Sequence, residues 1–131
     1  MTYLFPIRLE MAVTSSASWQ QFLWVGIGFL NKYIDCPNIN GKAKKVRLVM
    51  MLYTSDSNGV SVMIKRKDDV EYLVVDNRVV WGGVSADAFG LLVYVPIDPS
   101  FIDSYSRFFL KSSNEGHGAG VSYIFAEVYY E

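Results

Sequence analysis

Apolar and polar positions alternate near the start of the chain, which predicts a β-strand. From Tyr3 to Val13 the apolar residues occupy every second position, so they fall on one face of an extended chain. Pro6 has no backbone N–H to donate, and we therefore expect this strand to begin near Pro6 or to lie at the edge of a sheet.

The apolar period then changes, and the new spacing predicts a long helix from about Ser16 to Tyr33. Its apolar positions recur every three or four residues: Trp19, Leu23, Ile27, Leu30 and Ile34. Ser18 and Gln21 have the spacing of a capping box, with Ser15 and Ser16 as alternative caps.

A second, shorter helix is predicted between Asp98 and about Lys111. Asp98 is a good N-cap, and Pro99 suits the first helical position. An apolar stripe follows at roughly helical spacing: Phe101, Tyr105, Phe108 and Phe109.

The segments between the two predicted helices have the pattern of successive hairpins. The expected strands are Lys45–Tyr53, Val60–Lys65, Glu71–Val75, Arg78–Trp81 and Val84–Val95. Their turns are expected at Asn58-Gly59, Asp68-Asp69 and Asp76-Asn77. The run FGLLVYV is the most apolar strand and favours a central position, and Val121–Tyr130 is the closing strand.

Together these elements predict an α+β fold: an antiparallel meander sheet packed against one long and one short helix. The length of 131 residues suits a single globular domain over residues 1–131. Cys36 is the only cysteine, so no internal disulfide can form and a reducing, cytoplasmic location is expected. The N-terminal residues do not have the pattern of a signal peptide.

The net charge of −1 does not point to wholesale nucleic-acid binding, but the basic residues are unevenly distributed. Seven of the twelve lie within a short stretch: Lys42, Lys44, Lys45, Arg47, Lys65, Arg66 and Lys67. We expect them to gather at the open end of the hairpin that turns at Asn58-Gly59. There they would bind an anionic surface, through phosphates of lipid head groups or nucleic acid. The alternative is that these residues only protect a sheet edge from aggregation, with Asp68 and Asp69 partly neutralising them.

The sequence offers little catalytic chemistry. His117 is the only histidine, and it lies in a glycine-rich loop where it is expected to be exposed. A dyad with Cys36 would require the fold to bring the two together. The glycines at 116, 118 and 120 precede a strand, whereas phosphate-binding loops precede a helix. We therefore expect no catalytic site, metal, cofactor or small-molecule substrate. An enzyme would need a polar cleft in which such groups converge.

The order of several segments resembles the globular core of the rhabdovirus matrix proteins. YLFPIRLEMAVTSS is similar to their opening strand, and WQQFLWVGIGFLNKYI stands where their long helix stands. INGKAKKVRLVMML is similar to their Gly-Lys loop and the strand after it. FGLLVYVPIDPSFIDSYSRFF looks like their apolar strand, acidic turn and short helix, and YIFAEVYYE like their closing strand.

This resemblance implies a non-enzymatic viral structural protein that self-associates, contacts the nucleocapsid and binds the inner face of the virion membrane from the host cytoplasm. The basic residues would then contact anionic lipid or nucleocapsid. The alternative that the residues leave open is a small interaction or inhibitor domain with one protein partner.

Overall fold

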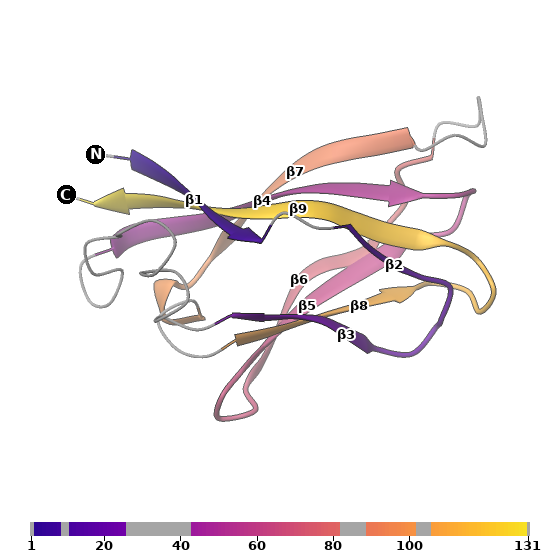
Figure 1. Ribbon diagram of the computed structural model, residues 1–131, viewed down its shortest axis with the longest axis horizontal. Helices are drawn as coiled ribbons and strands as arrows, with labels where there is room; N and C mark the ends of the chain where they lie inside the picture. The colour runs from indigo at the N-terminus through magenta and orange to yellow at the C-terminus, as the bar shows by residue number, and fades with distance from the viewer. Residues whose placement is uncertain (1, 9–10, 26–42, 82–88, 102–105, 131) are drawn as a thin grey trace.

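The chain folds as two antiparallel β-sheets that face one another, with no long helix in the described part (Figure 1). The computed structural model describes residues 2–8, 11–25, 43–81, 89–101 and 106–130. Sheet A has the strand order β1 (Thr2–Arg8), β9 (Ala119–Tyr130), β4 (Ala43–Thr54) and β7 (Phe89–Ile97). The short strand β2 (Ala12–Thr14) also pairs with β9. Sheet B has the order β3 (Gln20–Val25), β8 (Ser106–Ser112), β5 (Val60–Arg66) and β6 (Glu71–Arg78).

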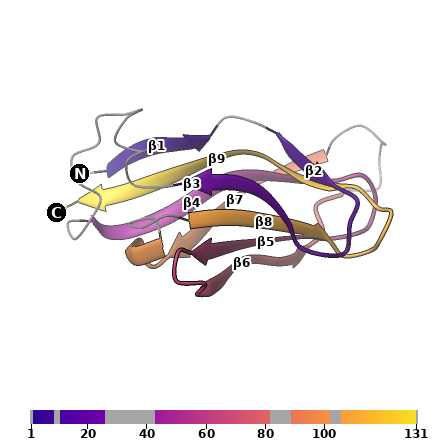
Figure 2. The same cartoon turned by 60° about the horizontal axis from the view of Figure 1, so that its bottom comes forward.

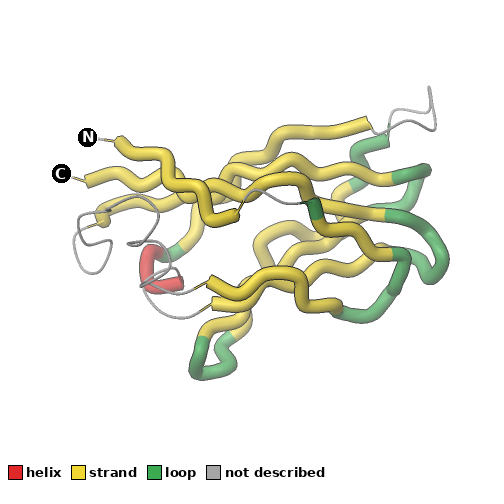
Figure 3. Tube along the Cα trace, in the orientation of Figure 1, coloured by secondary structure: helices red, strands yellow, loops and turns green. Residues whose placement is uncertain are grey.

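The strand order is that of a jelly roll. Among the described strands, only β1–β2 and β5–β6 are successive strands of the same sheet, and every other successive pair lies in opposite sheets. In each sheet a strand from the second half of the chain lies between two from the first half: β9 lies between β1 and β4, and β8 between β3 and β5 (Figure 2). Figure 3 shows the strands in yellow and the loops that connect them in green. This double-sheet arrangement of eight long strands is the jelly-roll solution to closing an antiparallel fold.

Alternating side chains of both sheets fill the space between them. On β4, Leu48, Met50 and Leu52 are completely buried, while Lys45 and Arg47 on the other face are exposed. On β8 every second residue from Ser106 to Ser112 is buried. The two inner faces make one apolar core, as expected for a sandwich with solvent on both outer faces.

The predicted α+β class is wrong, because the described part of each expected helix contains a strand. Gln20–Val25, inside the long predicted helix, is β3, and Ser106–Ser112, inside the short one, is β8. The two segments pair with each other, from Gln20 opposite Leu110 to Val25 opposite Ser106. The pairing joins residues more than 80 positions apart in the sequence, so a local pattern gives no sign of it. Residues 16–19 of the long predicted helix form the loop before β3, whereas residues 26–33, Cys36 and Lys42 lie outside the described residues.

The predicted meander is also wrong. Asn58 and Gly59 do not join a hairpin, because β4 belongs to sheet A and β5 to sheet B. β7, expected to be central, is at the end of the order in sheet A. Asp76 and Asn77 do not end a strand but form a bulge within β6, where Val62 pairs with Val75 and Val60 with Arg78.

Three local predictions are confirmed. β1, which contains Pro6, is an edge strand. The β5–β6 connection is a tight turn at Asp68-Asp69, with Asp69 at a φ of 64°. Asp98 caps a helical turn, since its carboxylate accepts a hydrogen bond from the Ser100 N–H at 2.9 Å. That turn is a 3₁₀-helix of three residues, η1 (Pro99–Phe101), and goes no further as a helix in the described residues.

Candidate functional site

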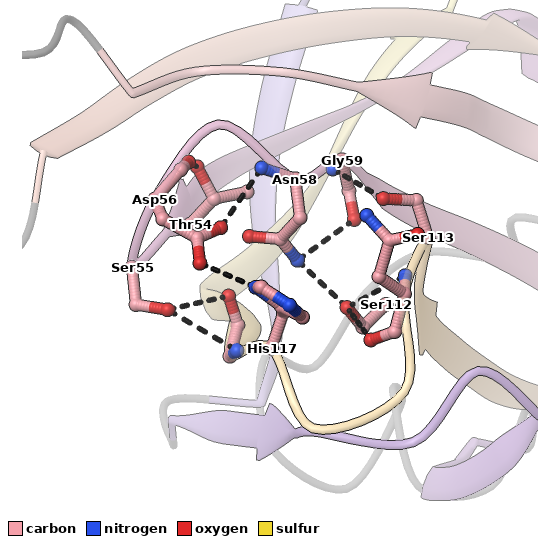
Figure 4. Close-up of polar contacts among 10 residues, drawn as sticks. Thr54, Ser55, Asp56, Asn58, Gly59, Ser112, Ser113 and His117 are labelled. Carbon is pink, nitrogen blue, oxygen red and sulfur yellow. Dashed lines mark hydrogen bonds and ion pairs between the residues drawn. The ribbon is translucent and has the colours of Figure 1, made fainter.

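A polar cluster links three crossover loops at one end of the sandwich. Figure 4 shows the contacts between two of them, the β4–β5 and β8–β9 loops. His117, in the β8–β9 loop, contacts Asp56 of the β4–β5 loop, with 2.5 Å between Nδ1 and the carboxylate oxygen. The hydroxyl of Ser55 donates to the carbonyl oxygen of Gly118 and accepts from its N–H. The β2–β3 loop joins through Ala17, whose N–H donates to the Glu115 carboxylate at 2.7 Å. These bonds connect loop to loop, so the cluster fixes the ends of both sheets relative to one another.

Asn58 and Gly59 are buried where the chain crosses from sheet A to sheet B. The Asn58 amide donates to the hydroxyl of Ser112 at 2.7 Å, and the Gly59 N–H donates to the hydroxyl of Ser113 at 2.7 Å. A Cβ on Gly59 would lie 2.9 Å from the backbone carbon of Asn77, in the β6 bulge. The Asn-Gly pair is thus needed for close packing between strands, rather than for a hairpin turn.

Asp56 is held in its ionised form. The backbone N–H of Asn58, and then the hydrogen bond with His117, lower the pKa of this carboxylate below its ordinary value. His117 is exposed, as the sequence analysis expected, but its carboxylate partner was not foreseen. An acid that orients a histidine is one part of a catalytic triad. The hydroxyl of Ser55 in this cluster is occupied by the backbone of Gly118, so the described bonds are those of a structural clamp.

The predicted basic residues lie on both sheets at the opposite end of the molecule. Lys44, Lys45 and Arg47 are exposed on the first half of β4, whereas Lys65 and Arg66 end β5 and Lys67 begins the turn after it. The short helix η1 contacts both strands, so the two groups share one end of the sandwich without forming one strand pair.

Acidic neighbours neutralise much of this charge. Arg47 pairs with Glu127 at 2.8 Å, and Arg66 pairs with Asp68 at 2.5 Å. Lys65 lies 3.5 Å from Glu71. The neutralisation expected from Asp68 is therefore present. Lys42 lies outside the described residues.

A shallow groove of about 510 Å³ lies beside the β4 group. Its lining comes from the ends of four strands and η1: Thr2, Lys44, Lys45, Val46, Arg47, Pro96, Ile97, Pro99, Glu127 and Tyr129. Three basic side chains and the Tyr129 ring border this groove. The exposed lysines therefore lie beside a hollow rather than on a flat surface. Among the described residues, no group of three or more histidine, cysteine or acidic side chains is arranged to hold a metal ion.

The outer face of sheet A is largely apolar, which the sequence analysis did not identify. Leu4, Leu92, Tyr94 and Tyr129 are exposed, at 54%, 39%, 51% and 39%. The pairing registers place them on one face with the Arg47–Glu127 pair between β1 and β7. The run FGLLVYV was expected to be a central strand because it is the most apolar one. In the structure it belongs to β7, an edge strand whose outer face is apolar and exposed.

No helix within the described ranges has the length and apolar character needed to cross a membrane.

No family model and no curated protein matches this sequence. Solved structures are similar in fold. The VP2 subviral particle of infectious bursal disease virus matches at 10% identity and a TM-score of 0.52, over 99% of this chain and 32% of that one. The Gx strain of the same virus matches at 11% identity and a TM-score of 0.55, again over 99% of this chain and 32% of that one. This chain therefore spans about a third of the length of these viral chains.

Two bacterial proteins contain the same fold. A β-porphyranase of glycoside hydrolase family 86 from Bacteroides plebeius matches at 17% identity and a TM-score of 0.53, over 97% of this chain and 20% of the enzyme. Latent PorU from Porphyromonas gingivalis matches at 9% identity and a TM-score of 0.53, over 99% of this chain and 12% of that one. At these identities the likenesses show a jelly-roll fold and nothing finer. The four structures named here include no rhabdovirus matrix protein.

Proposed function

We propose that this chain is a non-enzymatic structural protein that assembles with copies of itself, as a viral coat protein does. The observation that carries the proposal is the jelly-roll strand order, in which nearly the whole chain matches the subviral particle protein VP2. The polar cluster supports it, because its bonds join loops rather than surround a cleft. The second candidate is an interaction domain of a larger protein, supported by the small fraction of PorU that this fold occupies.

The two candidates differ in their behaviour in solution. A coat-like protein is expected to form oligomers whose size increases with concentration, and to form closed particles. Light scattering after size exclusion measures the oligomers, and negative-stain electron microscopy shows the particles. An interaction domain would remain a monomer at every concentration and be retained by one protein partner, and that outcome would contradict the proposal.

We further propose that the basic end of the sandwich contacts a phosphate-rich surface, either anionic lipid or the nucleic acid of a nucleocapsid. Lys44 and Lys45 are exposed beside the groove described above. Each lysine near an anionic surface contributes up to about 1 kcal/mol. The Lys44→Gln/Lys45→Gln variant is thus expected to bind between about threefold and about thirtyfold more weakly at low salt.

Sedimentation with vesicles of anionic phospholipid, and a filter assay with single-stranded RNA, separate the two sources of phosphate. Lys111→Gln is the matched control, since Lys111 lies on β8 with its ammonium group 4.7 Å from the centre of the Trp19 ring. Equal binding by the double variant and the control, or binding that does not weaken with salt, would reject the contact.

A further inference from the structure

In the part of the sandwich that the structure describes, the edge strands β1, β7, β3 and β6 differ in how well they are protected against pairing. β1 contains Pro6 and an irregular register after it, and β3 has an irregular register between Gln21 and Leu23. β6 carries charged residues and the bulge at Asp76 and Asn77. Prolines, bulges and charges are the devices by which proteins block association at sheet edges.

β7 carries the fewest of these devices. Its pairing with β4 is uninterrupted from Phe89 to Ile97, and no residue of the strand is charged. Pro96 lies one residue before the end of β7, which leaves seven residues from Phe89 to Val95 without an interruption. Their outer backbone groups follow a regular strand and form a template for another strand.

A groove lined by both apolar and charged side chains lies along the same edge. It has a volume of about 510 Å³, and its walls come from β6 and β7: Val74, Val75, Asp76, Arg78 and Leu91 to Val95. A strand added to β7 would alternate its side chains between this groove and the outer face of sheet A. Leu92 and Tyr94, which are exposed on that outer face, would gain neighbours on the added strand.

We infer that β7 is the self-association edge, and that it pairs antiparallel with β7 of a second copy about a two-fold axis. The inference rests on the proposed self-assembly and names its surface. A two-fold axis makes the strands antiparallel and gives both copies the same hydrogen bonds. Because β7 has no charge, self-pairing places no like charges opposite each other in any register.

Electrostatics favour this edge over the apolar outer face of sheet A. The ion pair of Arg47 and Glu127 lies within that face, and face-to-face packing would remove both charges from water. Edge pairing leaves them in solvent. Seven residues extend only about 23 Å, so the contact belongs to the small, weak class of interface and association is expected to depend strongly on protein concentration.

The test introduces like charges at the exposed positions of β7. The Leu92→Lys/Tyr94→Lys variant is expected to dissociate at least about tenfold more readily than the unaltered chain in sedimentation velocity. A 1:1 mixture with Leu92→Glu/Tyr94→Glu is expected to restore association in a register that brings positions 92 and 94 of the two copies opposite each other. Thermal unfolding of the isolated variants establishes that each is folded.

The control variant is Leu4→Lys, which adds one positive charge on the same face but on the β1 edge. If the copies pair at the β7 edge, the dissociation constant of Leu4→Lys is expected to stay within about twofold of that of the unaltered chain. If the copies packed face to face, Leu4→Lys would weaken association as the β7 substitutions do. Hydrogen exchange adds a direct readout, because the β7 amides that do not bond to β4 should exchange more slowly in the associated state.

The possible outcomes separate this inference from the proposed function. Assembly that is unchanged in the β7 variants overturns the inference and leaves the proposed function standing. A dimer lost in the β7 variants, without larger particles from the unaltered chain, supports the edge and counts against a coat. A chain that is monomeric at all concentrations, or β7 amides that exchange equally fast in both states, rejects the edge pairing.

Discussion

Replacing Phe108 with alanine is expected to lower the free energy of unfolding by about 3–5 kcal/mol. Phe108 is completely buried at the middle of β8, and its ring lies 6.0 Å from that of Phe22 on β3. The substitution leaves a cavity between the sheets that neighbouring strands cannot close without losing their pairing. Domains of this kind are stable by about 5–15 kcal/mol, so the variant loses a large share of its stability. Urea unfolding followed by circular dichroism measures the loss.

Phe109→Ala is the matched control. Phe109 is the next residue on β8, points to the outer face, and has the Arg107 guanidinium 5.9 Å from the centre of its ring. Its truncation is expected to cost about 1 kcal/mol, since Phe109 is only partly buried on the outer face and the loss is limited to that partial burial and the cation contact. In a helix, both rings would belong to one apolar stripe and their losses would be similar. Equal losses would therefore contradict β8 as a strand.

The helix predictions failed for a physical reason that these two residues illustrate. Phe108, Phe109 and Leu110 are consecutive apolar residues, so the alternation of β8 is hidden in the sequence. In β3 the irregular register between Gln21 and Leu23 shifts the alternation in the same way. Each strand is specified mainly by the other, and their pairing spans most of the chain. The local preference of a segment for helix or strand therefore has less influence on its final structure than such long-range pairing.

The turn signals were recognised, but their roles depended on the tertiary fold. Asp68-Asp69 lies between strands of one sheet and forms a hairpin, whereas Asn58-Gly59 lies between strands of different sheets. The sequence cannot distinguish these cases, because both have turn residues between apolar runs. When such a connection crosses to the other sheet instead of closing a hairpin, the predicted meander becomes a jelly roll.

The candidate sites were predictable to different degrees. The basic residues from Lys44 to Lys67 are visible as a charge cluster, and the structure places the described ones at one end of the molecule. Binding by this cluster remains a prediction. The contact between Asp56 and His117 was not predictable, since it depends on two loops meeting 61 positions apart. The apolar β7 edge was visible as the most hydrophobic run, but its meaning depended on knowing that no strand covers it within the described sheet.

Gly120→Ala is expected to destabilise the protein by about 1–3 kcal/mol, the usual cost of forcing an atom into a filled space. Gly120 lies on β9 between β2 and β4, paired with Val13 on one side and Tyr53 on the other. An added Cβ would lie 2.7 Å from the backbone carbonyl oxygen of Ala12 and would also collide with the Tyr53 ring. The backbone cannot move away without breaking the pairing of β2.

Gly90→Ala tests the reason for this cost. Gly90 is also a strand glycine opposite Tyr53, but there the added Cβ would meet the sulfur of Met51, at 2.8 Å. Met51 has a flexible side chain that can turn aside, so this variant is expected to change stability by less than about 0.5 kcal/mol. Chemical unfolding of both variants, with hydrogen exchange at the β2 amides, compares the two sites. If Gly120→Ala were as stable as Gly90→Ala with β2 still protected, the close packing of β2, β9 and Tyr53 described here would be wrong.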